Sequence, residues 1–131
     1  MIKRYLAKIL AKDRQGLQVI SACCAGAKTK ITDIKYLSRN KIFLLSLERL
    51  SKESNNDSLK INSICKFEFV DSVRSKNIDQ NDLNLALELF TIEVLKKKEN
   101  FEINLIFSDN AYITLSTEIV EVTLEDQNKD L

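Results

Sequence analysis

The chain has 131 residues, of which 44% are hydrophobic and 30% are charged, and its net charge is +1. This composition predicts a single globular domain over residues 1–131 and excludes a fibre or a disordered chain. A chain of this length buries roughly two-thirds of its unfolded surface, so it needs no metal or disulfide to hold a core. The 20 basic and 19 acidic residues balance, so no overall field attracts nucleic acid or an anionic membrane.

The absence of histidine excludes most routes to enzyme catalysis. Ser-His-Asp and Cys-His nucleophiles and histidine-ligated zinc all need an imidazole. Two glycines cannot build a glycine-rich phosphate loop, and no acidic spacing matches a calcium loop. We therefore expect a protein that is not an enzyme, with no catalytic residue, metal site or cofactor.

The sequence carries no sign of export or membrane insertion. Lysines interrupt residues 1–12, unlike the apolar core of a signal peptide. The longest weakly polar run, residues 19–27, is far shorter than the ~20 residues of a membrane helix. We therefore predict a cytoplasmic protein.

The three cysteines fit the same prediction. An odd number with Cys23 and Cys24 adjacent is not typical of a secreted disulfide framework. Neighbouring side chains on a helix point about 100° apart, so these two cannot easily share a bridge or a ligand. We interpret both, and Cys65, as small buried hydrophobic residues.

The first predicted element is a helix over residues 13–25, with Asp13 as its N-cap. Gly26 can end this helix in a left-handed conformation. Apolar residues recur at spacings of three and four, which is typical of one helical face. They are Leu17, Ile20, Cys24 and Ala27.

Strand patterns follow the helix. Residues 31–37 and 41–50 are predicted to form a hairpin around the turn at residues 38–40. A polar stretch, residues 51–58, is predicted to be an exposed loop before a strand over residues 59–73. The alternation in that strand predicts a buried face. Its members are Cys65, Phe67 and Phe69.

Residues 83–95 fit two structures. Leucines at every second position indicate a strand, whereas a helical stripe after Asp82 is the alternative. The second half, residues 90–94, is β-branched and aromatic, which favours a strand.

The clearest alternation in the chain predicts a strand over residues 101–107. The apolar pattern resumes at Ile113. Only a loop with an odd number of residues puts the apolar side chains of both strands on the same face of the sheet. We predict a three-residue loop, residues 109–111, with a positive φ at Asn110 or Ala111.

The last predicted strand covers residues 119–124, and residues 126–131 are expected to form a loose tail. The sum is one N-terminal helix and six or seven antiparallel strands. Such a sheet must curl or be covered to hide its apolar face, so we predict an α+β half-barrel or roll. A pleckstrin-homology-like barrel is an alternative in this class. Those barrels, however, close with a C-terminal helix.

Arginine is the most informative cation here, because its planar fork can grip a phosphate or a carboxylate. Arg49 follows an apolar strand, and Arg74 lies in a polar run, residues 71–77. The alternative for Arg74 is a solvated turn with an ion pair to a nearby acid. Five residues are thus candidate ligands of an anion. They are Arg49, Ser72, Arg74, Ser75 and Lys76.

Two charged groups are interpreted as exposed surface. The lysines at residues 96–98 are expected at a hairpin tip. Nucleic acid is not an expected partner, because aromatic residues are not interleaved with these lysines. Four acidic residues are expected on an exposed strand face rather than at a metal site. They are Glu118, Glu121, Glu125 and Asp126.

Several segments, in order along the chain, resemble domain-of-unknown-function family 2948. They are residues 13–22, 31–37, 43–49, 67–78 and 124–126. The resemblance spans most of the chain, from about Leu6 to Asp126, and Arg49 and Arg74 fall where the family also has arginine. The family consists of small uncharacterised bacterial proteins, so the resemblance implies a bacterial cytoplasmic protein and supplies no catalytic or binding residue.

We hypothesise a non-catalytic interaction or binding module, which binds a second copy of itself or another protein. It would use an exposed sheet edge or the curved face of the roll. The alternative is a small anionic-ligand-binding domain, in which Arg74 or Arg49 grips the ligand in a pocket under the sheet.

Overall fold

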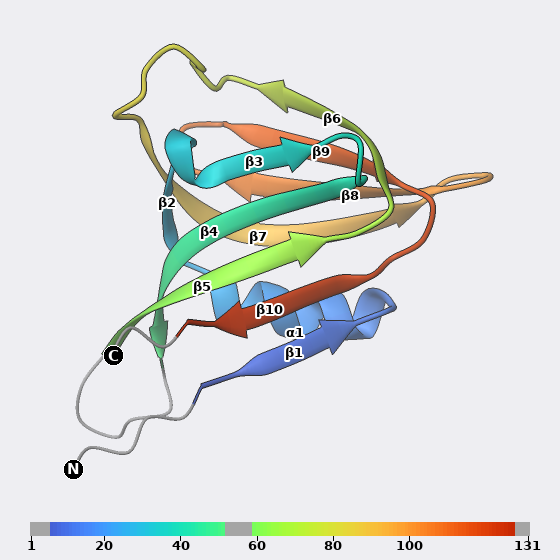
Figure 1. The fold of residues 1–131 in the computed structure, drawn as a ribbon, viewed down its shortest axis with the longest axis horizontal. Coiled ribbons are helices and arrows are strands. Elements are labelled where there is room, and N and C mark those ends of the chain that lie inside the picture. Colours follow the sequence, from blue (N-terminus) through green and yellow to red (C-terminus); the bar gives the residue numbers. More distant parts are fainter. Residues whose placement is uncertain (1–5, 52–58, 128–131) are drawn as a thin grey trace.

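The computed structural model describes residues 6–51 and 59–127 (Figure 1). This part of the chain contains an α-helix, a short 3-10 helix and ten strands. The helices are α1 (Arg14–Cys24) and η1 (Ile31–Asp33). The strands are β1 (Lys8–Ala11), β2 (Lys28–Lys30), β3 (Ile34–Leu37), β4 (Ile42–Ser51), β5 (Leu59–Phe67), β6 (Val70–Lys76), β7 (Ala86–Lys96), β8 (Phe101–Phe107), β9 (Tyr112–Thr117) and β10 (Val122–Asp126).

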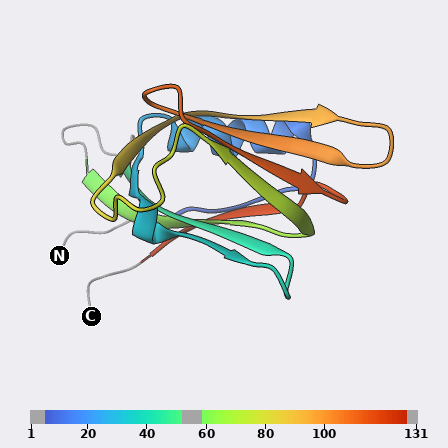
Figure 2. The same cartoon turned by 90° about the horizontal axis from the view of Figure 1, so that it is seen from above.

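The strands form one curled, open antiparallel sheet. Its order is β1-β10-β5-β4-β2-β7-β8-β9-β6, and β3 pairs with β4 next to β2. Seen from above, the half that contains β4 and β5 faces the half that contains β8 and β9 (Figure 2). The predicted α+β class, with one N-terminal α-helix packed on a curved antiparallel sheet, is confirmed for the described residues.

The inward side chains of both halves meet in one core. Phe43 and Phe67 pack edge to face, with ring centroids 5.9 Å apart. Ile103, Leu105 and Phe107 are buried against them from the opposite half, as their alternation predicted. Both inner faces are therefore apolar, and the curl removes them from water.

The predicted helix is confirmed. Asp13 is its N-cap, because the carboxylate accepts a hydrogen bond of 2.7 Å from the Gly16 amide. Leu17, Ile20 and Cys24 are buried. Gly26, just beyond the helix, has a φ of 84°, which favours glycine.

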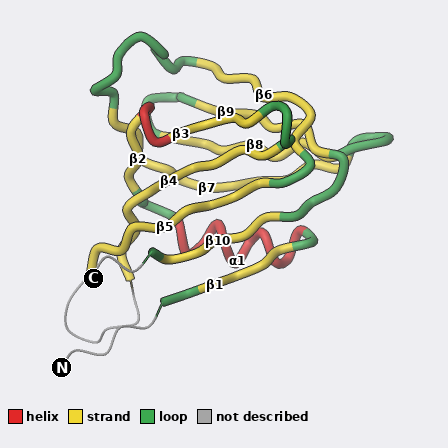
Figure 3. Tube along the Cα trace, viewed as in Figure 1, coloured by secondary structure: helices red, strands yellow, loops and turns green. Residues whose placement is uncertain are grey.

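Helix α1 lies against β1 and β7 and closes the space between them (Figure 3). Strand β2 is short and covers only residues 86–88 of β7. Further along β7, the Ile92 amide donates to Ser21 Oγ at 2.9 Å, and Arg14 Nη2 donates to the Val94 carbonyl at 3.3 Å. The helix thus supplies hydrogen bonds that a neighbouring strand would otherwise give.

The sheet has more strands than the predicted six or seven. Strands β1 and β2 were not predicted, and the predicted strand over residues 59–73 is two strands, β5 and β6. The chain passes from one half of the sheet to the other at Phe69, which has a φ of 59°. Phe69 is 38% exposed, so its predicted place on the buried face was wrong, while Cys65 and Phe67 are buried.

Other boundaries shift by a few residues. The predicted hairpin forms between β3 and β4, although residues 31–33 are a 3-10 turn. Strand β7 covers residues 86–96, which confirms a strand rather than a helix for most of the predicted residues 83–95 but starts three residues later. Of the predicted polar loop, Ser51 belongs to β4, and residues 52–58 lie outside the described residues.

The turn between β8 and β9 has the predicted odd length but lies one residue earlier. Leu105 pairs with Ile113, and the loop is formed by residues 108–110. Asn110 has a positive φ of 59°, as predicted, and so has Asp109. Ala111 is not part of the loop, because its carbonyl accepts a hydrogen bond from the Phe107 amide.

The last strand is β10, which begins later and ends later than the predicted residues 119–124. Ile119 lies outside it and is exposed. The predicted loose tail starts too early, because Asp126 is the buried last residue of β10. The amide of the next residue, Gln127, donates to the Asn62 carbonyl. Residues 128–131 lie outside the described part of the chain.

Candidate functional site

A groove opens between β3 and β6, where the curl does not bring the two strands into pairing. Its volume is about 310 Å³. Phe43 and Ile113, both buried, form its floor. Side chains of β3 and β6 form its walls: Ile34, Tyr36, Val73 and Ser75. Four residues line the rest: Ile31, Ile78, Gln80 and Leu83.

The walls follow from strand alternation. Successive side chains of a strand point to opposite faces, so every second residue enters the groove. On β3 these are Ile34 and Tyr36, and on β6 they are Val73 and Ser75. The groove is therefore mainly apolar, with one hydroxyl in the β6 wall.

One end of the groove is closed by hydrogen bonds. The Tyr36 hydroxyl donates to the Val70 carbonyl at 2.9 Å, and the Val70 amide donates to the Lys41 carbonyl at 2.8 Å. The Tyr36 side chain thus links two strands whose backbones do not pair with each other in the described structure.

The other end is formed by the loop after β6. Leu83 in this loop is 64% exposed, while Ile78 packs against the core. Gln80 Nε2 donates to Ser75 Oγ at 3.1 Å, and Asn77 Nδ2 donates to the Asn110 carbonyl at 2.8 Å. These contacts hold the loop against β6 and against the turn between β8 and β9.

Both strands beside the groove have an unpaired edge in the described structure. Strand β3 pairs with β4, and β6 pairs with β9. The N–H and C=O groups of an edge strand are a template for an added strand. The groove thus combines an apolar floor with free backbone groups.

The candidate residues around Arg74 do not converge on one point. They lie on strand β6 rather than in a turn. Ser72, Arg74 and Lys76 point to the outer face, opposite to Ser75 in the groove. Arg74 is 69% exposed, and its Nη2 lies 3.7 Å from Glu102 Oε2, as the ion-pair alternative predicted.

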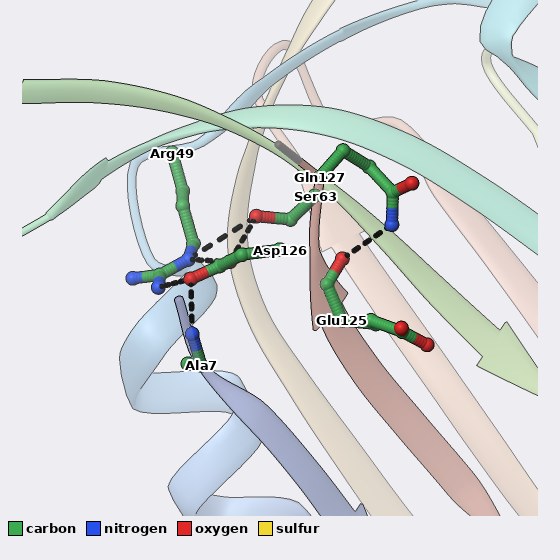
Figure 4. A network of polar contacts seen from close by, with 6 residues as sticks. All are labelled: Ala7, Arg49, Ser63, Glu125, Asp126 and Gln127. Carbon is green, nitrogen blue, oxygen red and sulfur yellow. Dashed lines mark hydrogen bonds and ion pairs between the residues drawn. The ribbon is translucent and has the colours of Figure 1, made fainter. Parts of the chain in front are cut away.

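Arg49 has a different environment. Its side chain is only 4% exposed, and Nη2 and Nε bind the two carboxylate oxygens of Asp126 at 2.6 and 2.9 Å (Figure 4). Ser63 Oγ donates to the same carboxylate at 2.6 Å, and so does the Ala7 amide at 2.7 Å. The carboxylate thereby joins β4, β5 and β10 to the residue before β1.

The charges of this pair stabilise each other. Burial alone would raise the pKa of Asp126, but the hydrogen bonds from Arg49, Ser63 and Ala7 outweigh it and lower that pKa. The hydrogen bond with Asp126 also raises the pKa of Arg49. Both groups are therefore charged at neutral pH, and two of the Arg49 nitrogens are engaged within the protein.

The sequence does indicate this ion pair, because both residues occupy inward positions in the alternation of their strands. An interpretation of each charged residue by itself does not detect it. Arg49 continues the inward positions of β4, after Leu45 and Leu47. Asp126 likewise continues the inward positions of β10, after Leu124. A charged residue at an inward, buried position of a strand needs an opposite charge nearby.

The four acidic residues near the C-terminal end have different environments. Glu118 and Glu125 are exposed as expected, but the prediction was wrong for Asp126. Glu121 is half-buried, and its contact with Glu68 raises the pKa of Glu68. Within the described ranges no group of three metal-ligating side chains forms.

The cysteines are free thiols, and Cys24 and Cys65 are buried as predicted. Cys23 is half-buried. Burial raises the pKa of Cys24 to about 12 and raises that of Cys65 as well. Neither buried thiol is a nucleophile at neutral pH, because the thiolate is the reactive form.

The fold and the groove define a small α+β domain built on an open, curled sheet. The family model described as "Protein of unknown function (DUF2948)" matches residues 7–131. The chain belongs to this family, which confirms the resemblance found in the sequence. No curated protein and no solved structure matches the chain. In the described residues, neither helix has the length and apolar character needed to span a bilayer.

Proposed function

We propose that this protein is a non-catalytic binding module that holds an extended segment of another protein in the groove between β3 and β6. The observation that carries the proposal is an apolar groove flanked by unpaired strand edges. In recognition by strand addition, main-chain hydrogen bonds give affinity and pockets for alternate side chains give specificity.

Strand β6 is the edge to which the segment would pair. Strands β3 and β6 run in opposite directions (Figure 1), so one inserted strand is antiparallel to only one of them. Strand β6 has seven residues and β3 has four, so β6 offers more backbone partners. Antiparallel pairing is also slightly more stable per residue.

The anionic-ligand alternative has less support. Two nitrogens of Arg49 bind Asp126, and Arg74 lies on the outer face, outside the groove. The groove itself is lined mainly by apolar side chains and contains no cationic group among its lining residues. An extended apolar segment is therefore a better match than a phosphate or a small carboxylate.

A selection of random decapeptides displayed on phage tests the proposal. The variant Ser75→Arg should abolish binding of the selected peptides, because a long charged side chain then fills the β6 wall of the groove. The matched control is Ser72→Arg, on the same strand but on the opposite face. Selected peptides should bind the control at least as tightly as they bind the unaltered protein.

Nuclear magnetic resonance of the labelled protein with a selected peptide locates the binding. Amide shifts should change along β6, most strongly for residues whose N–H groups point away from β9. Selected peptides that bind Ser75→Arg unchanged, or an absence of any binder, would refute the proposal. Self-association through this edge would instead appear as a dimer that Ser75→Arg converts to a monomer.

A further inference from the structure

Positive charge lines both long sides of the groove. Lys35 extends from the outer face of β3, and Arg74 and Lys76 extend from the outer face of β6. All three side chains are exposed, and the contact of Arg74 with Glu102 is long, at 3.7 Å. An exposed pair of this kind is weak, so Arg74 can exchange its partner.

Apart from Glu102, which contacts Arg74, and Asp33, which directly precedes β3, the negative charges nearby lie at the ends of the groove. Asp71 is engaged with Lys41 at 3.0 Å, close to the end that Tyr36 closes. Asp79 and Asp82 lie in the loop at the opposite end. Their carboxylates accept backbone hydrogen bonds from Asn81 and Asn84, at 3.0 and 3.2 Å. The long sides therefore carry a net positive charge.

An added strand must present one set of side chains to the groove and the other to the outer face. The inward set meets Phe43, Ile113 and Val73. The outward set lies between Lys35 on one side and Arg74 and Lys76 on the other. Opposite charges on neighbouring strands stabilise a sheet, and like charges destabilise it.

We infer that the segment bound at this groove alternates apolar residues, which enter it, with acidic residues, which face Lys35, Arg74 and Lys76. This inference rests on the proposed function and specifies the partner as an acidic, extended peptide. The apolar residues supply the burial, and the acidic residues set which sequences are accepted.

Two synthetic peptides test the inferred preference for acidic residues. One has the capped sequence Thr-Val-Glu-Val-Glu-Val-Glu-Thr, and the other has lysine in place of each glutamate. We expect the acidic peptide to bind at least about tenfold more tightly at low salt, because close charge complementarity separates partners in this way. The ratio should fall at high salt, since exposed charges are screened.

Charge reversal in the protein supplies the matched test. Arg74→Glu combined with Lys76→Glu should remove the preference for the acidic peptide and favour the lysine peptide. The control is Lys8→Glu combined with Lys66→Glu, which reverses two charges on β1 and β5, in the other half of the sheet. The control should keep the preference of the unaltered protein.

The outcomes separate the two proposals. Equal binding of both peptides, or an unchanged preference after the charge reversal on β6, would overturn the inferred preference for acidic residues but not the proposed function. Phage-selected peptides that lose binding to Ser75→Arg but lack alternating acidic residues would also overturn only the inferred preference for acidic residues. If neither synthetic peptide binds and the phage selection yields no peptide sensitive to Ser75→Arg, both proposals fail.

Discussion

Arg49 and Asp126 are 77 residues apart in the sequence, and they form a two-pronged ion pair inside the protein. The two heavy-atom distances are 2.6 and 2.9 Å, and water reaches almost none of either side chain. A buried pair of this kind is hardly better than two apolar residues, but breaking it is strongly destabilising. The pair therefore specifies how β4 and β10 are placed.

The variant Asp126→Ala should lower the free energy of unfolding by about 3–5 kcal/mol, because it leaves Arg49 charged and buried without its partner. Urea denaturation measures this loss. The control is Glu125→Ala, at the exposed neighbouring position, which should change stability by less than about 0.5 kcal/mol. Similar losses in the two variants would contradict the structural role of the pair.

The double variant Arg49→Met with Asp126→Leu should be more stable than Asp126→Ala. It removes both charges and fills the space with apolar side chains, which is often neutral for a buried pair. Urea denaturation of the single and double variants gives the comparison. A double variant less stable than Asp126→Ala would show that the charges themselves hold the strands together.

The stability contributed by Asp126 should depend on pH in the acid range. The pKa of this carboxyl is lower in the folded protein than its unfolded value, about 3.9. Its contribution is therefore complete above about pH 4 and is lost as the pH falls through the folded value. The difference in unfolding free energy between the unaltered protein and Asp126→Asn should shrink below that pH. A difference that stays constant down to strong acid would contradict this.

The variant Ser21→Ala should destabilise the protein by about 1–3 kcal/mol, because the Ile92 amide loses its hydrogen-bond acceptor. Thermal unfolding measures the loss, and amide hydrogen exchange should show reduced protection at Ile92. Gln18→Ala, on the exposed surface of α1, is the control. Unchanged protection at Ile92 would mean that Ser21 does not act as the partner of β7.

Thiol titration should separate the cysteines. Cys24 and Cys65 are buried, and burial raises their pKa values, so they should stay unreactive in the folded protein at pH 8. Half-buried Cys23 should react first, and Cys23→Ser should remove that fast phase. All three thiols should react in urea. A fast phase that survives Cys23→Ser would place another thiol at the surface.

The elements with a strong local signal were predictable from the sequence. The cap at Asp13 and the spacing of Leu17 and Ile20 define α1 within a residue at each end. Strand β8 shows full alternation over residues 101–107. Strand β2, Lys28–Lys30, has no such signal, because Thr29 is its single buried side chain. Its place depends on pairing with β7.

In the sequence, the boundary between β5 and β6 at Phe69 is visible only as a shift in the alternation of apolar residues. Phe67 and Val70 are both buried, although their odd separation puts them on opposite faces of a continuous strand. The groove could not be predicted, because its walls come from strands that do not pair with each other. Local patterns predict which residues of β3 and β6 face inward but not which strands meet.

Among the residues that the structure describes, strand β1 pairs only with β10, with Lys8 opposite Glu125. The ribosome makes Lys8 well before Glu125, because the two residues are far apart in the sequence. The edge formed by β1 must therefore wait until almost all of the described chain has emerged, and Arg49 lacks its carboxylate for most of that time. The sheet is therefore completed at the same stage at which the buried charge of Arg49 is neutralised. A nascent chain that stops before Asp126 cannot form the complete fold.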